Sequence, residues 1–364
     1  MPVRILATAV LGTAAATVLA RAGRGVPAAM GADRAALRAA ATRSPHASGA
    51  YFRNTRRGVS LQAGGPQLLR AAMADRATGR PSRDVPLTRP ELPERAAPLA
   101  ATWFGHSSVL LEIDGRRVLA DPMWSERASP SPRIGPRRLH PVPVPLDALP
   151  PVDAVLISHD HYDHLDMPTI QALARSGGAP FVVPLGVGAH LRAWGVPGER
   201  VVELDWNEET EVAGLRITCT EARHFSGRGL LRNTTLWSSW AVSGPGRRVF
   251  FGGDTGYTQA FAAVGSRLGP FDLAVLPIGA YSDLWPDVHM TPEEAVRAHT
   301  DLRADLLLPV HWGTFNLAFH AWSEPVDRLR AAAGTSVRVV VPRPGERIDA
   351  ADPPEPHGWW APIG

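Results

Sequence analysis

The densest group of chemically active side chains is the run SHDHYDH at residues 158–164, which has the spacing H-x-H-x-D-H. It follows residues 152–157, a short apolar segment that predicts a buried strand. Imidazole and carboxylate groups at the end of a buried strand are costly unless a positive partner satisfies them. A divalent metal ion, or a pair of them, is the simplest partner, because both groups ligate zinc and similar first-row ions. The run therefore predicts a metal site.

Three further residues stand in the same kind of position, each after an apolar run: His224, Asp254 and His311. Side chains at the ends of several strands converge at one edge of an α/β sheet, where metal and ligand sites form. One such residue alone would favour a structural role, but together with residues 158–164 they predict a metal centre. The single cysteine, Cys219, excludes a disulfide within the chain and a multi-cysteine zinc site. We expect Cys219 to be a small buried hydrophobic residue.

The elements that must position these residues alternate along the chain from about residue 100. Apolar runs predict strands at 101–113, 116–121, 152–158, 180–184, 200–204, 215–222, 235–242, 247–252, 271–278, 304–310 and 337–341. Helices are predicted near 166–175, 187–194, 257–267, 292–300 and 324–332. The Asp114-Gly115 pair predicts a hairpin turn between the first two runs. This order favours an α/β fold in which two mixed β-sheets pack together with helices outside.

Length and charge narrow the class of protein. A chain of 364 residues with 45% hydrophobic and 20% charged residues is typical of a large globular domain with appendages, or of two smaller domains. Residues 1–100 carry 15 arginines and 5 acidic residues, whereas residues 101–364 carry 23 arginines and 30 acidic residues. The mildly acidic body argues against nucleic-acid binding, and the basic N-terminal part suits anionic lipid.

We divide the chain into four parts. Residues 1–24 contain an uncharged run at 5–20 and predict a signal peptide or membrane anchor. We therefore expect export or membrane association. The alternative is an interfacial helix on a cytoplasmic protein. Residues 25–98 predict an arm rich in Arg, Ala and Pro. Residues 99–345 form the predicted catalytic domain, and residues 346–364 a C-terminal tail.

Several motifs resemble a known family. H-x-H-x-D-H followed by separated His, Asp and His resembles the metallo-β-lactamase fold of binuclear hydrolases. A closer resemblance, to the N-acyl-phosphatidylethanolamine-hydrolysing phospholipase D family and its bacterial relatives, covers residues 101–322. It rests on WFGHSS at 103–108, DPMWSERASP at 121–130, GGDTGY at 252–257, PIGAY at 277–281, PEEA at 292–295 and HWGTF at 311–315. The resemblance implies a four-layer αββα sandwich and phospholipase D-type cleavage of phospholipid phosphodiesters.

The resemblance also implies a ligand set for two Zn²⁺ ions, with iron or manganese as alternatives. One ion would be held by His159, His161 and His224. The second would be held by Asp163, His164 and His311, with Asp254 bridging both. Two cations about 3.5–4 Å apart can share a hydroxide and hold the attacking and leaving oxygens of a phosphoryl transfer.

Other residues have lesser predicted roles. His289 matches a family histidine near the substrate phosphate and is predicted, with Asp163, to act in catalysis. Arg133, where the mammalian enzyme has a Gln-Tyr pair, is predicted to bind phosphate. Asp121 and Asp160 are candidates for orienting the imidazoles, and His106 is expected to be structural.

Alternative functions remain open at this point. The same scaffold supports lactonases, including sugar-phosphate lactonases, and other ester or amide hydrolases, because a fold does not determine a substrate. A metal-binding or membrane-associated module without turnover is a third interpretation. The expected partners are a phospholipid or another phosphodiester and a peripheral membrane contact, and the sequence leaves the oligomeric state open, a homodimer included.

Overall fold

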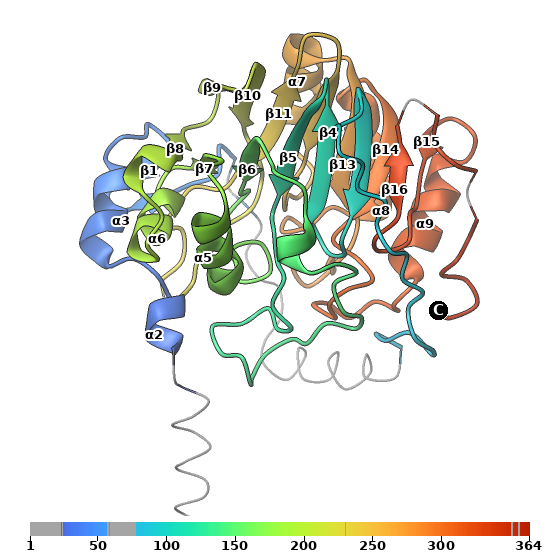
Figure 1. Ribbon diagram of the computed structural model, residues 1–364, viewed down its shortest axis with the longest axis horizontal. Helices are drawn as coiled ribbons and strands as arrows, with labels where there is room; N and C mark the ends of the chain where they lie inside the picture. The colour runs from blue at the N-terminus through green and yellow to red at the C-terminus, as the bar shows by residue number, and fades with distance from the viewer. Residues whose placement is uncertain are drawn as a thin grey trace, which may run out of the picture.

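The fold consists of two β-sheets packed face to face, with helices outside them (Figure 1). The computed structural model describes residues 23, 25–56, 58, 78–229, 231–350, 352–355 and 357–364. In this part of the chain each of the two main sheets has seven strands, and a small two-stranded sheet is formed by β1 (Ala47–Ser48) and β2 (Tyr51–Phe52). The predicted four-layer αββα architecture is confirmed.

The first sheet is antiparallel at one side and parallel at the other. Its strand order is β16 (Arg347–Asp349), β3 (Leu99–Trp103), β4 (Val109–Ile113), β5 (Arg116–Ala120), β6 (Ala154–Leu156), β7 (Phe181–Pro184) and β8 (Val201–Leu204). The strands from β16 to β5 are antiparallel, and those from β5 to β8 are parallel. The predicted Asp114-Gly115 turn joins β4 to β5, and both turn residues have positive φ, 47° and 80°.

The second sheet has the same mixed character. Its order is β15 (Arg338–Val339), β14 (Ala304–Val310), β13 (Phe271–Pro277), β12 (Arg248–Phe251), β11 (Ser239–Ser243), β10 (Leu215–Thr220) and β9 (Glu209–Val212). The strands from β9 to β12 are antiparallel, and those from β12 to β15 are parallel. Cys219 in β10 is fully buried, as expected.

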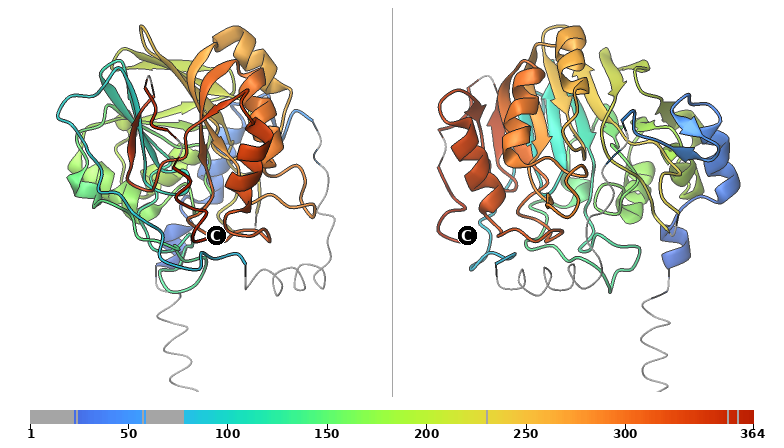
Figure 2. Two further views of the ribbon diagram at one scale, coloured as in Figure 1. Left: turned by 90° about the vertical axis from the view of Figure 1, so that its right-hand side faces the viewer. Right: turned by 180° about the vertical axis from the view of Figure 1, so that it is seen from behind.

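Helices cover the outer faces of both sheets, as the layers in Figure 2 show. The helices α5 (Met167–Ser176) and α6 (Val187–Ala193) cover the first sheet, and α7 (Ala260–Leu268), α8 (Pro292–Asp301) and α9 (Glu324–Ala333) lie on the side of the second. In β6, Ala154 and Leu156 point into the core between the sheets, whereas Val155 packs with α5 and α6. The two-residue period of a strand explains this alternation, and burial on both faces explains the continuous apolar runs.

One predicted strand is interrupted. The run at 101–113 forms both β3 and β4, because the chain turns at Gly105 and His106, whose φ angles are 101° and 51°. A Cβ atom at Gly105 would lie 2.7 Å from His140 Cε1 and 2.9 Å from Thr314 Oγ1, so the turn requires glycine. The prediction of one strand was wrong because the flanking apolar residues hide this turn.

The sheet extends beyond residue 345, where we expected a tail to begin. Strand β16 pairs with β3, with Ile348 opposite Ala101, and Trp359 and Trp360 pack into the main core. Strand β16 has one apolar residue in three, so hydrophobic periodicity carries no signal for it.

The N-terminal arm is partly structured. The helix α3 (Arg34–Ala41) lies beside α6 at the left of Figure 1 and contacts it, and α2 (Val26–Ala29) lies below them. The predicted signal peptide or anchor at 1–24 falls almost entirely outside the described residues. Among the residues that are described, no helix combines the length and apolar character needed to cross a bilayer.

Candidate metal centre

The candidate site lies where strands of both sheets end. Asp121 follows β5, the H-x-H-x-D-H run follows β6, and His224, Asp254 and His311 follow β10, β12 and β14. Asp121 and His311 have left-handed backbones, with φ of 40° and 61°. Residues other than glycine seldom adopt this conformation, and it is concentrated at functional sites.

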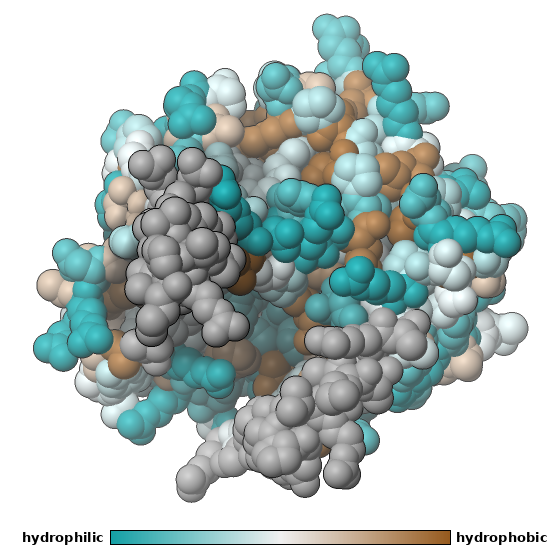
Figure 3. Space-filling model, turned by 90° about the horizontal axis from the view of Figure 1, so that it is seen from below, coloured by the Kyte–Doolittle hydropathy of each residue, from teal (hydrophilic) through white to brown (hydrophobic). Residues whose placement is uncertain are grey.

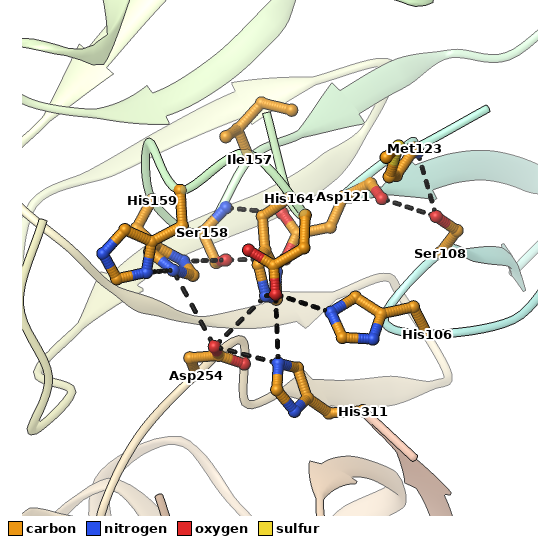
Figure 4. A network of polar contacts seen from close by, with 12 residues as sticks. His106, Ser108, Asp121, Met123, Ile157, Ser158, His159, His164, Asp254 and His311 are labelled. Atoms are coloured by element: carbon orange, nitrogen blue, oxygen red, sulfur yellow. Dashed lines mark hydrogen bonds and ion pairs between the residues drawn. The ribbon is translucent and has the colours of Figure 1, made fainter. Parts of the chain in front are cut away.

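The structure brings together all seven residues predicted as ligands. Figure 4 shows Asp254 among His159, His164 and His311. Its Oδ2 atom is 3.1 Å from His311 Nε2 and 3.2 Å from His164 Nε2. The same oxygen is 3.7 Å from His224 Nε2 and 3.8 Å from His159 Nε2. One carboxylate oxygen therefore faces histidines from both predicted ligand groups.

Each ligand group is compact. His159, His161 and His224 place their ligand atoms within 4.8 Å of one another and of Asp254. In this group His161 Nδ1 is 2.8 Å from His159 Nε2 and 3.3 Å from His224 Nε2. Nitrogen atoms this close would suit a shared cation.

The other group has a member that the sequence did not indicate. Asp163, His164 and His311 place their ligand atoms within 4.8 Å of one another and of His106. His106 Nε2 lies 2.8 Å from Asp163 Oδ2, and its ring centre is 4.1 Å from that of His311. We expected His106 to be structural, but its ring lies among the ligand atoms of this group. The sequence marks His106 only as part of a Gly-His pair at a turn, and such pairs are too common to indicate a metal site.

The outward-facing nitrogens of three cluster histidines have partners that fix the rings. His164 Nδ1 lies 2.7 Å from Asp121 Oδ2, and His224 Nδ1 lies 2.9 Å from the carbonyl oxygen of Val288. His159 Nδ1 lies 2.9 Å from Ser158 Oγ. A ring that donates from Nδ1 to an oxygen leaves Nε2 as a lone-pair ligand when the ring is neutral. Asp121 thus occupies the orienting position that we predicted.

The pKa values differ between the two groups. Burial lowers the pKa of His159 well below its usual value and that of His224 to about 3. Burial also opposes protonation of His311, but Asp254 and Asp163 outweigh it and raise the pKa of His311 to about 9. His164 holds the pKa of Asp254 well below its usual range despite burial. In the second group burial also lowers the pKa of His106, to about 3, so the raised value of His311 is not shared by the whole group.

Several buried polar atoms in the cluster have no hydrogen-bond partner in the described chain. They are His106 Nδ1, His164 Nε2, His289 Nδ1, Asp254 Oδ1 and both ring nitrogens of His311. Buried polar atoms are normally satisfied, and each exception requires an explanation. Bound cations would satisfy the inward-facing atoms, so the residues present fit a metal site.

His289 lies at the edge of this cluster. Its Nδ1 atom is 3.9 Å from Asp254 Oδ2, and its ring stacks on His311 with 4.9 Å between centres. It borders a cavity of about 310 Å³ that Tyr281 and Phe319 also line. As predicted, it precedes the first turn of α8, where Thr291 and Glu294 form a capping box.

The remaining candidates lie away from the cluster atoms. Asp160 accepts a hydrogen bond from Gly227 N at 2.7 Å and faces His190 rather than a cluster histidine. Tyr162 also turns away, and its hydroxyl donates to the carbonyl oxygen of Arg228 at 2.6 Å. Arg133 is exposed in the loop after β5, outside the grouped ligand atoms, so its phosphate-binding role stays a prediction.

Comparisons with known proteins cover the same strands and loops. A family model described as the β-lactamase superfamily domain matches residues 116–312. An uncharacterised protein of Mycobacterium tuberculosis is 54% identical over 363 residues, 98% of each chain. The N-acyl-phosphatidylethanolamine-hydrolysing phospholipase D 1 of Caenorhabditis elegans is 40% identical over 245 residues, 64% of this chain and 69% of the worm protein. The solved structure of Igni18, a metallo hydrolase from Ignicoccus hospitalis, matches with a TM-score of 0.54 at 24% identity and covers 69% of this chain and 97% of that one, which shows a shared fold.

Proposed function

The chain belongs to the β-lactamase superfamily and is a metal-dependent hydrolase, and from this premise we propose that it cleaves phosphodiester bonds in phospholipids. The proposed reaction is of the phospholipase D type, in which an N-acyl-phosphatidylethanolamine gives phosphatidic acid and an N-acylethanolamine. The observation that carries the proposal is Asp254, whose Oδ2 lies within 3.8 Å of four histidine nitrogens drawn from both ligand groups. A shared carboxylate of this kind suits two cations in one site.

The residues divide between two ions, for which we propose zinc. His159, His161 and His224 would hold one ion. Asp163, His164 and His311 would hold the other, and Asp254 would contact both. When bound, two such ions supply Lewis acidity that activates water and stabilises negative charge on phosphoryl oxygens.

The chain's own residues position the reacting groups. Asp121 and the Val288 carbonyl hold His164 and His224 in the orientation that directs their Nε2 atoms inward. His289 stands between the cluster and the neighbouring cavity, and burial lowers its pKa well below the usual value. The N–H of the neutral ring could donate to a phosphoryl oxygen of the substrate. A donor placed at developing negative charge lowers the reaction barrier. Arg133 is assigned a weaker, guiding contact with phosphate.

The lipid substrate is supported by the worm relative's activity and by the character of one face. The loop after β5 runs along the bottom of Figure 1, and the face seen from below has brown hydrophobic patches among hydrophilic residues (Figure 3). Ile134 in that loop has 59% of its surface exposed. The exposed isoleucine would let this loop contact the acyl chains of a lipid substrate.

The test uses the purified full chain, loaded with zinc, on three substrates: an N-acyl-phosphatidylethanolamine, bis-p-nitrophenyl phosphate and a panel of lactones. We expect phosphatidic acid and N-acylethanolamine as products, loss of turnover with a chelator, and recovery on adding metal. In ¹⁸O-labelled water the label should enter phosphatidic acid, because water attacks phosphorus. Faster turnover of a lactone than of both phosphodiesters would contradict the proposal, and so would the absence of metal-dependent turnover.

A further inference from the structure

A buried arginine holds the outer side of the loop that carries the predicted ligands. Arg228 is 6% exposed, and its Nη1 donates to the carbonyl oxygens of Asp160 and Leu165, both at 2.7 Å. These two carbonyls stand near the two ends of residues 159–165, which include Asp163. One guanidinium nitrogen therefore joins the two ends of the loop.

The same guanidinium is anchored by the N-terminal arm. Its Nε and Nη2 atoms donate to the carbonyl oxygen of Ala29, at 3.0 and 2.9 Å, and Trp194 Nε1 donates to the carbonyl oxygen of Ala28 at 2.7 Å. Both acceptors lie at the end of α2, where the Ala28 carbonyl oxygen also accepts from the backbone N–H of Gly31 at 3.0 Å. The guanidinium also lies over the rings of Tyr162 and Trp194, 4.1 and 4.9 Å from their centres. We call residues 25–32 the docking segment.

A second contact fixes the docking segment in one place. The backbone N–H of Ala32 donates to His190 Nδ1 at 3.0 Å, and His190 Nε2 lies 3.5 Å from Asp160 Oδ2. Gly31 has a φ of 86°, and a Cβ atom there would lie 2.1 Å from His190 Nδ1. Any side chain at this position would push the segment off the imidazole.

We propose that Arg228 is a positioning residue that, together with the docking segment, holds the metal-binding loop in its ligating geometry. The proposal rests on the proposed function for the identity of the loop as a metal site. Several ligand groups come from one short loop, and a loop already fixed at both ends loses less conformational entropy when it binds metal. Lysine has one ammonium group and cannot reproduce the planar set of donors that reaches three carbonyls.

The chain offers matched controls for this test. Arg200 also donates to backbone carbonyls, those of Ala174 and Ala179, and it lies over the ring of Phe181 at 5.4 Å. Its contacts are with the opposite end of α5, away from the ligand loop. Gly214, in the β9–β10 turn, has a φ of 82°, and a Cβ atom there would meet no other atom within 4 Å.

The experiment compares Arg228→Lys and Gly31→Ala with the controls Arg200→Lys and Gly214→Ala. We expect the two test variants to bind Zn²⁺ about 10- to 100-fold more weakly in competition with a chromophoric chelator. We also expect an altered visible spectrum when Co²⁺ is bound, and faster hydrogen exchange at residues 159–165 in the metal-free protein. The controls should match the wild type in all three measurements.

Each outcome decides between the inference and the proposed function. Wild-type zinc affinity, cobalt spectrum and loop exchange in both test variants would overturn the role of Arg228 and the docking segment. Equal losses in Arg200→Lys would overturn it as well, because the effect would then be general destabilisation. A wild-type protein that binds no metal would refute the proposed function. Faster hydrogen exchange at residues 159–165 in the test variants would still support the role of Arg228 and the docking segment in holding the loop.

Discussion

Replacing Asp121 by asparagine tests how the cluster is oriented. Asp121 Oδ2 lies 2.7 Å from His164 Nδ1 and accepts a hydrogen bond from Ser158 Oγ at 2.6 Å, and Oδ1 accepts from Ser158 N at 2.7 Å. Asparagine has one acceptor oxygen, so in either orientation its NH₂ group faces a donor. With the NH₂ group toward His164, the ring must move its proton from Nδ1 to Nε2. A ring protonated at Nε2 cannot use that nitrogen as a ligand.

The size of the effect follows from this one contact. A hydrogen bond to a charged group contributes about 1.5–3 kcal/mol. If that energy selects the ligating form of His164, its loss lowers metal affinity about 10- to 100-fold, which is the usual effect of changing a residue that orients a ligand. Backbone geometry near Asp121 should change little, because asparagine has almost the same shape.

The measurement is zinc affinity by chelator competition, with metal content checked after dialysis. Asp166→Asn is the matched control, since buried Asp166 accepts hydrogen bonds from Ser125 N and from the hydroxyls of Ser125 and Thr169 but not from a histidine. We expect a loss of affinity in Asp121→Asn and wild-type affinity in the control. A folded Asp121→Asn protein that binds zinc as tightly as the wild type would refute the reasoning.

Three further predictions concern single groups. Zinc uptake at pH 7 should release protons, because His311, with a metal-free pKa of about 9, must lose its proton to bind, whereas His224, with a pKa of about 3, is already neutral. Zinc affinity should therefore increase as the pH rises toward 9. Calorimetry in buffers of different ionisation enthalpy counts the released protons, and uptake without release would contradict this prediction. His289→Gln should lower kcat about 100-fold or more while zinc stoichiometry stays unchanged, and a parallel loss of zinc would assign His289 to the metals instead. Cys219 should not react with a thiol reagent until the protein is unfolded, because it is fully buried and burial raises its pKa well above the usual value; rapid reaction of the native protein would be inconsistent with this burial.

The sequence was sufficient for the strands that are buried on both faces and for the residues that follow them. Strands β13 and β14 are apolar from Leu273 and Leu306 onward, so their ends, and therefore the position of His311, could be located to within a residue. The ligand set followed from the same logic together with the family resemblance. The orienting role of Asp121 could also be predicted, because an aspartate at the end of a strand beside predicted ligands can accept a hydrogen bond from a ligating histidine.

The unpredicted features depend on contacts between distant segments. His106 belongs to the site because a glycine turn directs the chain past Thr314, whose Oγ1 accepts a hydrogen bond from the His106 N–H at 2.6 Å. Strand β9 alternates between polar and weakly apolar residues at the sheet edge. The sequence does not distinguish Arg228 from other loop arginines, because its contact with α2 forms only in the folded protein. None of these contacts leaves a periodic pattern in the local sequence.

The site is complete only when the two sheets are packed together. The first sheet supplies the H-x-H-x-D-H loop, and the second supplies His224, Asp254 and His311. At their junction Ser238 N donates to the carbonyl oxygen of Ser158 at 2.9 Å, and Trp240 Nε1 donates to that of Ile157 at 3.1 Å. Next to Asp254, a Cβ atom on Gly253 would lie 2.4 Å from that of Ser158, so the close approach requires glycine. Metal ions held by residues from both sheets would bind the packed state and not the unfolded chain, and should therefore stabilise the packing of the two sheets as well as supply the chemistry.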